Sequence, residues 1–175
     1  MKKLLALLLL SVTLITLCAC SNESDVPDGM KNVAAENAPF SLYVPSTWIE
    51  QTESGVSGAS FSNDDTSNVT VLAYQPGEVM TPAEYWEKVA LPEYQNGVLK
   101  DLLILDNLCG DEVLGGLNAK KYVYSFTLGT KTYRQMQLIT LKSDRIYIMT
   151  YTATAENFDK HLEEVESIRA NFKFR

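Results

Sequence analysis

The predicted fold depends most on one stretch, residues 145–153, Arg-Ile-Tyr-Ile-Met-Thr-Tyr-Thr-Ala. Successive side chains of a β-strand point to opposite faces of the sheet. Ile146 and Ile148 would therefore lie on one face, and Tyr147 and Met149 on the other. A strand that is apolar on both sides is typical of the centre of a sheet covered on both faces. We therefore expect helices on each side of the sheet.

The sequence before this strand predicts an antiparallel meander. Lys121 to Leu128 and Thr132 to Lys142 alternate like strands, and the turns at Gly129-Thr130 and Ser143-Asp144 join them to the central strand. Tight turns of this kind connect antiparallel neighbours. Further strands are expected at residues 40–44, 59–62 and 69–74, with a broken strand over 101–105 and 111–114. The prediction is an α+β fold with an antiparallel sheet of about six strands packed between helices.

Two helices are expected to cover this sheet. Thr81, Pro82 and Glu84 form a capping box with proline at the first helical position. Pro92 is expected to end that helix, with a further turn at Glu93-Tyr94 before Gly97 as the alternative. The second helix is expected to open at Thr154 and to close one face of the sheet. Its apolar stripe consists of Phe158, Leu162, Val165, Ile168 and Phe172.

The amino terminus has the pattern of an export signal. Lys2 and Lys3 precede an uncharged run from Leu4 to Ala19, which falls short of the roughly 20 apolar residues that a spanning helix needs. The stretch Leu17-Cys18-Ala19-Cys20 resembles the bacterial lipoprotein signal, except that Cys18 stands where that signal usually has a small or aliphatic residue. The resemblance implies cleavage before Cys20 and acylation of its thiol. The alternatives are an ordinary signal peptide or an uncleaved N-terminal helix.

These features divide the chain into three parts. Residues 1–19 are the predicted signal peptide, 20–39 a flexible spacer rich in Ser, Asn, Asp and Glu, and 40–175 a single domain. The predicted location is the cell membrane, with the domain lipid-anchored on the extracytoplasmic side. The sequence leaves open whether this is a single membrane or an outer membrane.

Charge narrows the range of partners. The chain carries a net charge of −7, and removal of Lys2 and Lys3 makes it more negative. An acidic domain repels phosphate backbones, so no nucleic-acid partner is expected. The membrane is then contacted through the lipid on Cys20 rather than through charge.

The mature sequence offers few groups for chemistry. Cys109 is the one cysteine left after Cys20 is acylated, and it is expected to be a small buried hydrophobe; a reactive thiol is the alternative. His161 is expected on the surface of the final helix. With one histidine and one free cysteine, neither a zinc site nor a serine triad is expected. Residues 63–66 are expected to form an Asx-type turn, because they depart from the calcium-loop spacing. We predict no metal, no cofactor and no enzymatic activity.

Three segments carry a resemblance to the PsbP-like domain. They are the extended run at 40–48 that ends in Pro-Ser-Thr-Trp, the glycine turn at 114–119, and the closing strand and helix over 147–172. The resemblance spans residues 40–174 and implies a PsbP-like α/β/α sandwich. It also implies a non-enzymatic domain that docks on a larger complex. The resembling segments contain no residue to which a catalytic role could be assigned.

Tyrosines are the functional candidates within the domain. A tyrosine suits an interface or a pocket edge, because one end of its side chain is apolar and the other is polar. The candidates are Tyr122, Tyr124, Tyr133, Tyr147 and Tyr151. The alternative is that they form cross-strand aromatic pairs with their hydroxyls at the rim of the sheet.

The sequence thus predicts a lipid-anchored, non-enzymatic binding or assembly module for an envelope protein complex of unknown identity. A small-ligand carrier with a tyrosine-lined pocket between sheet and helix is the alternative.

Overall fold

A computed structural model describes residues 26–51 and 56–175 of the chain. The signal peptide at 1–19 and Cys20, with the signal residues Leu17, Cys18 and Ala19, lie outside the described residues. Within the described part of the chain, no helix is both long and apolar enough to cross a membrane.

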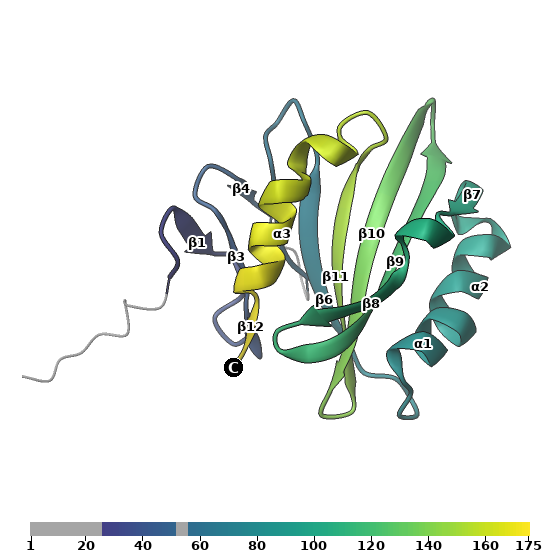
Figure 1. Ribbon diagram of the computed structural model, residues 1–175, viewed down its shortest axis with the longest axis horizontal. Helices are drawn as coiled ribbons and strands as arrows, with labels where there is room; N and C mark the ends of the chain where they lie inside the picture. Colours follow the sequence, from purple (N-terminus) through teal and green to yellow (C-terminus); the bar gives the residue numbers. More distant parts are fainter. Residues whose placement is uncertain (1–25, 52–55) are drawn as a thin grey trace, which may run out of the picture.

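An eight-stranded antiparallel sheet forms the centre of the domain (Figure 1). The strand order is β4-β5-β6-β11-β10-β9-β7, and β8 also pairs with β9. The predicted α+β class is confirmed, and the sheet has more strands than the six expected. Its strands are β4 (Ile49–Glu50), β5 (Val56–Ser60), β6 (Asn68–Tyr74), β7 (Lys100–Ile104), β8 (Gly110–Leu114), β9 (Leu117–Leu128), β10 (Lys131–Lys142) and β11 (Arg145–Thr154).

The central position of β11 is confirmed. β11 pairs with β6 on one side and with β10 on the other. Tyr147 and Met149 belong to one hydrophobic core, whereas Ile146 and Ile148 belong to a second core on the opposite face. The alternation in residues 145–153 therefore builds a core on each side of the sheet.

The final helix covers the first face. A 3₁₀ turn, η4 (Phe158–His161), leads into α3 (Leu162–Asn171), and Val165 and Ile168 of α3 are fully buried against the sheet. The helix begins later than the expected Thr154, because β11 continues to that residue. Burial of an aliphatic side chain contributes about 1.5–3 kcal/mol, so this contact is a main source of stability.

A longer helical segment covers part of the second face (Figure 1). It runs through α1 (Pro82–Tyr85), η1 (Trp86–Ala90), α2 (Leu91–Glu93) and η2 (Tyr94–Val98). The capping box at Thr81 and Glu84 is present as predicted. A second 3₁₀ turn, η3 (Asp106–Leu108), lies between β7 and β8.

The helix does not end at Pro92, and the alternative of a further turn at Glu93-Tyr94 before Gly97 is the one observed. The backbone N–H of Leu91 bonds to the carbonyl of Trp86, five residues earlier, so the helix widens into a π turn just before the proline. A wider turn relieves the contact that a proline ring makes with the preceding turn. The chain leaves the helix at Gly97, where φ is +98°.

The prediction of a flexible spacer over residues 20–39 is wrong for the second half of that range. β1 (Met30–Asn32) pairs with β3 (Tyr43–Pro45), and Val33 is 1% exposed in the first core. β2 (Phe40–Ser41) pairs with β12 (Lys173–Phe174) near the carboxyl end. The folded domain therefore begins before Phe40, because an isolated apolar residue such as Val33 can anchor an otherwise polar segment.

Candidate functional site

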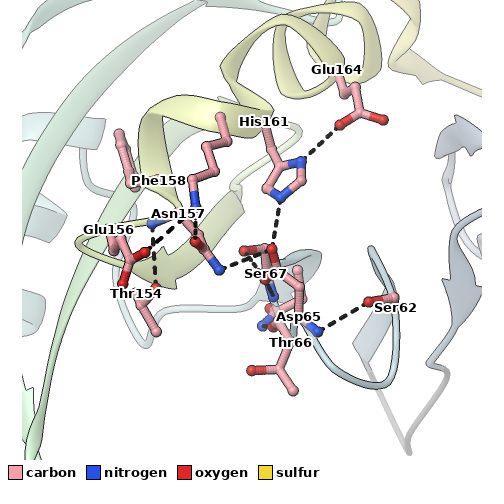
Figure 2. Close-up of polar contacts among 12 residues, drawn as sticks. Ser62, Asp65, Thr66, Ser67, Thr154, Glu156, Asn157, Phe158, His161 and Glu164 are labelled. Atoms are coloured by element: carbon pink, nitrogen blue, oxygen red, sulfur yellow. Dashed lines mark hydrogen bonds and ion pairs between the residues drawn. The ribbon is translucent and has the colours of Figure 1, made fainter.

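Three segments of the chain meet at a partly buried polar cluster at one end of the sheet. Asp65 lies on the loop between β5 and β6, His161 ends η4, Glu164 lies in the first turn of α3, and Trp48 follows β3. Figure 2 shows the imidazole of His161 between the two carboxylates. We call Trp48, Asp65, His161 and Glu164 the histidine cluster.

The distances within the histidine cluster are those of hydrogen bonds. Nε2 of His161 lies 2.9 Å from Oδ2 of Asp65, and Nδ1 lies 2.9 Å from Oε2 of Glu164. The indole N–H of Trp48 donates to Oε1 of Glu164 at 3.3 Å. The cluster therefore ties α3 to two loops on the same side of the sheet.

The expectation that His161 lies on the helix surface is wrong. The residue is 6% exposed, and its ring lies 4.2 Å from the ring of Phe61. It sits at the junction of a 3₁₀ turn with an α-helix, where the number of residues per turn changes from about 3.0 to 3.6. If the α-helical period of 3.6 residues is extended back through this junction, it places the His161 side chain on the solvent side of the helix, whereas the structure places it inside.

The geometry favours the protonated form of His161. Both ring nitrogens face a carboxylate oxygen, and an ionised carboxylate only accepts hydrogen bonds. Both nitrogens can donate at the same time only when the ring is an imidazolium. Burial lowers the pKa of His161, but the hydrogen bonds to Asp65 and Glu164 outweigh burial and raise the pKa above its usual value.

Asp65 is the most heavily bonded member of the cluster. Its carboxylate accepts from the backbone N–H of Ser67 at 3.0 Å, from the Ser67 hydroxyl at 2.6 Å and from the amide of Asn157 at 3.0 Å, as well as from His161. Burial raises the pKa of Asp65, but these hydrogen bonds outweigh it and lower the pKa to about 2. The Ser67 bond closes an Asx turn at residues 65–67, which overlaps the turn expected at residues 63–66 and begins later.

This arrangement restricts the chemistry of the cluster. A general base or a metal ligand needs a free lone pair on the imidazole, and in the imidazolium form neither ring nitrogen has one. The hydroxyl of Ser67 bonds to Asp65 and not to His161, so the hydroxyl–imidazole pair of a serine triad is not formed. Among residues 26–51 and 56–175, no group of three or more His, Cys, Asp or Glu side chains is placed to hold a metal ion. The geometry fits a structural role, in which the histidine cluster holds the start of α3 against the β5–β6 loop.

A polar pocket of about 400 Å³ lies beside the histidine cluster. The loop that carries Asp65 forms one wall, and the ends of β10 and β11 form the other. Its lining residues are Asp64, Asp65, Thr66, Lys131, Thr132, Thr154, Ala155, Glu156 and Asn157. A second pocket, of about 600 Å³, lies between the start of α1 and the β8–β9 hairpin. Neither of these two pockets has a tyrosine in its lining.

The candidate tyrosines do not form one site. Tyr122, Tyr124 and Tyr133 lie on the face covered by α1–η2, whereas Tyr147 and Tyr151 lie on the face covered by α3. They are therefore divided between the two sides of the sheet.

The two most buried candidates have satisfied hydroxyls. The hydroxyl of Tyr124 donates to Gln135 at 2.6 Å, and that of Tyr151 donates to the carbonyl of Phe158 at 2.9 Å. Burial raises the pKa of both phenols. Tyr122 stacks on Trp86 with ring centroids 4.1 Å apart. The candidate tyrosines thus lie in or against the two cores, and Tyr124 and Tyr151 are buried with their hydroxyls instead of placing them at the rim of the sheet.

Cys109 is half-buried rather than fully buried. Its sulfur accepts the backbone N–H of Val123 at 3.3 Å and lies 3.5 Å from the carbonyl of Leu105. The thiol therefore joins the loop after β7 to β9.

Comparisons with known proteins identify the fold. No protein family and no curated protein matches the sequence. Among solved structures, cyanobacterial PsbP (CyanoP) from Synechocystis sp. PCC 6803 has a TM-score of 0.61 and 11% identity, over 91% of this chain and 99% of that chain. The Ran-binding protein Mog1p of Saccharomyces cerevisiae has a TM-score of 0.57 and 9% identity, over 83% and 95% of the two chains.

A third similar structure comes from a bacterial envelope protein. LpqN, which is involved in cell envelope biogenesis of Mycobacterium tuberculosis, has a TM-score of 0.56 and 15% identity, over 82% of this chain and 90% of that chain. Identities this low show similarity of fold alone. The chain therefore has a PsbP-like α+β fold.

Proposed function

We propose that this chain is a lipid-anchored extracytoplasmic protein whose PsbP-like domain is a non-enzymatic binding or assembly module for an envelope protein complex. Acylation of Cys20 supplies the membrane contact, and the surface of the domain supplies the protein contact.

The observation that carries the proposal is the short distance along the chain between Cys20 and the folded domain. Ten residues lead from Cys20 to Met30, where β1 begins. A fully extended chain spans at most about 3.6 Å per residue, so this tether would be at most about 36 Å long. An anchor this close holds the domain next to the bilayer, where an envelope complex is accessible.

The similar structures support a binding role. Mog1p is a Ran-binding protein, and LpqN is involved in cell envelope biogenesis. The histidine cluster adds support, because its polar groups are satisfied by one another and serve the packing of α3. Function on this fold is then expected at the surface.

Labelling tests the anchor. Cells that express the full chain are grown with labelled palmitate, and the wild type is compared with Cys20→Ser and with Cys109→Ser. We expect label in the wild type and in Cys109→Ser, and none in Cys20→Ser. Equal labelling of all three chains would show that Cys20 is not the acylated residue.

Crosslinking on intact cells tests the partner. The tagged full chain is compared with a control in which residues 1–25 precede an unrelated soluble domain, so that both proteins occupy the same membrane. We expect an envelope protein that is recovered with the full chain and not with the control. Recovery of the same proteins with both, across growth conditions, would count against a docking domain.

A further inference from the structure

Four cationic side chains gather at the end of the sheet where β10 turns into β11. Lys142 and Arg145 lie directly opposite one another on either side of that turn, Lys173 lies on β12, and Arg175 follows it. The ammonium of Lys142 lies 4.6 Å from the ring centroid of Phe174 and donates to the main-chain oxygen of Arg175 at 3.0 Å, so the turn and β12 are joined. Lys142 is half-buried, and the other three are exposed. We call Lys142, Arg145, Lys173 and Arg175 the basic end.

The contacts of the basic end differ from those of other cations in the protein. Elsewhere in the described residues several Lys and Arg side chains pair with carboxylates, as Lys88 does with Glu84 at 2.9 Å. Arg145 instead donates to a side-chain amide oxygen at 3.4 Å, and Arg175 donates to hydroxyl and carbonyl oxygens. Of the hydrogen bonds that Lys142, Arg145 and Arg175 make within residues 26–51 and 56–175, none goes to an Asp or Glu side chain. These charges can therefore bind an anion from outside the domain.

The basic end keeps a positive charge on a chain whose net charge is −7. Asp144 at the tip of the turn and a carboxylate on Arg175 would offset two of its four positive charges and leave the rest. The arrangement also costs stability, because like charges directly opposite one another on paired strands repel, as Lys142 and Arg145 do here. A local feature that works against stability is expected where the residues serve a function.

The basic end lies beside the segment that leads to the predicted anchor. The ammonium of Lys173 lies 5.9 Å from the ring centroid of Tyr43, which pairs with Asn32 of β1. The guanidinium of Arg175 donates to the carbonyl of Glu36, four residues after the end of β1, at 2.8 Å. Figure 1 shows β12 and the carboxyl end on the same side of the molecule as β1 and β3.

We propose that the basic end contacts the anionic phospholipid headgroups of the membrane that holds the acylated Cys20. The ten residues from Cys20 to β1 span at most about 36 Å, which keeps the basic end close to the bilayer. Lys and Arg form charge-assisted hydrogen bonds with phosphate oxygens, and basic side chains are attracted to a surface of anionic lipids. The inference rests on the proposed anchoring at Cys20, because the anchor brings the basic end within reach of the headgroups.

This contact gives the domain an orientation. The acidic remainder of the domain is repelled by anionic headgroups, whereas the basic end is attracted, so the domain turns its basic end toward the bilayer. The lipid on Cys20 then supplies the attachment and the basic end supplies the direction. An acidic protein would also complement the charge of the basic end, but it would have to enter between the domain and the bilayer to bind there.

Fluorescence quenching in vesicles tests this orientation. The acylated chain with Cys109→Ser is purified from membranes and reconstituted in phosphatidylcholine, alone or mixed with phosphatidylglycerol. A neutral fluorophore is attached to Ser143→Cys in the turn of the basic end, or to Asn63→Cys on the loop at the other end of the sheet; both positions are exposed. Lipids with a spin label on the headgroup are the quencher. In the anionic vesicles we expect quenching at residue 143 to be about three-fold stronger than at residue 63, and this difference should be lost in neutral vesicles and at high salt.

Charge variants connect the orientation to the basic end. Lys142→Gln with Arg145→Gln removes two charges from the basic end, and Lys131→Gln with Lys160→Gln is the matched control at the other end of the sheet. We expect the first pair to remove the difference in quenching and the control pair to keep it, with thermal midpoints of unfolding within a few degrees of the parent. Equal quenching at residues 143 and 63 of the parent in anionic vesicles, or stronger quenching at residue 63, would overturn the inference. A difference that the first pair leaves unchanged would do the same.

Flotation of the same samples separates this inference from the proposed anchoring. A chain that floats with neutral vesicles is anchored whatever its orientation. If it floats and residues 143 and 63 are quenched equally in anionic vesicles, the anchoring stands and the orientation is wrong. If the chain does not float with neutral vesicles, or floats equally well with Cys20→Ser, the anchoring at Cys20 is wrong and this inference falls with it.

Discussion

Replacement of His161 by glutamine tests how much the histidine cluster contributes to stability. Glutamine has one donor group and one acceptor oxygen and carries no charge, so it cannot donate to Asp65 and Glu164 with two charge-assisted bonds. Hydrogen bonds to charged groups contribute about 1.5–3 kcal/mol each. Both carboxylates keep partial contact with solvent, with side-chain exposures of 21% and 36%, which reduces the loss. We expect His161→Gln to lower the free energy of unfolding by about 2–4 kcal/mol at pH 6.

The pH dependence gives a sharper signature than the size of the loss. The pKa of His161 is raised in the folded protein, so its stabilisation is complete below about pH 6.5, the unfolded value, and is lost as the pH rises through the folded-state pKa. Between these two pKa values the free energy of unfolding falls by about 1.4 kcal/mol per pH unit. The pKa of Asp65 is lowered to about 2, so its contribution is present above about pH 4 and is lost as the pH falls toward 2.

Urea unfolding at a series of pH values measures both effects. Trp48 reports on the site directly, because its indole donates to Glu164 and its ring lies 6.4 Å from that of His161. Lys160→Gln is the matched control, since this side chain is adjacent in sequence and 58% exposed. The control should keep the wild-type decline above pH 6.5, and His161→Gln should abolish it. An unchanged decline in His161→Gln would refute the imidazolium between two carboxylates.

Two further changes test how local sequence fixes the fold. Gly115 has φ of +58°, and a Cβ there would lie 2.7 Å from the ring of Phe174. Gly115→Ala is therefore expected to cost about 2 kcal/mol or more. Gly116 also has a positive φ, but a Cβ there would have no atom within 4 Å, so Gly116→Ala should lower the free energy of unfolding by less than Gly115→Ala. A lower urea midpoint for Gly116→Ala than for Gly115→Ala would contradict the contact between residue 115 and Phe174. Thr81→Ala removes the side-chain acceptor for the backbone N–H of Glu84 and is expected to lower stability by about 1 kcal/mol. Faster amide exchange in the first turn of α1 would accompany that loss, and unchanged exchange would show that the cap contributes little.

The sheet could be predicted from sequence because it depends on period-two alternation. Residues 145–153 show apolar side chains in both phases, and the structure places that strand between β6 and β10 with a core on each face. The glycine and Ser-Asp turns on either side of β10 set the hairpins in the same way. A regular local pattern is visible in sequence whatever the rest of the chain does.

The sequence left open whether the helix continues beyond Pro92. Proline normally ends a helix because it lacks an N–H and crowds the preceding turn. Here the bond from Leu91 to Trp86 skips one extra residue and makes room for the ring. Burial of Trp86 against Tyr122 and Tyr124 holds this irregular turn in place, and that stabilisation comes from another part of the chain.

The histidine cluster was also hidden from sequence reasoning. Asp65 and His161 are separated by 96 positions, and the helical periodicity around His161 suggested a solvent-facing side chain. A signal was nevertheless present in the sequence. It contains an aspartate at the start of an Asx turn and a lone histidine just before an amphipathic helix, and both side chains need polar partners. Only the topology of the sheet, which brings the β5–β6 loop under the start of α3, shows that they satisfy each other.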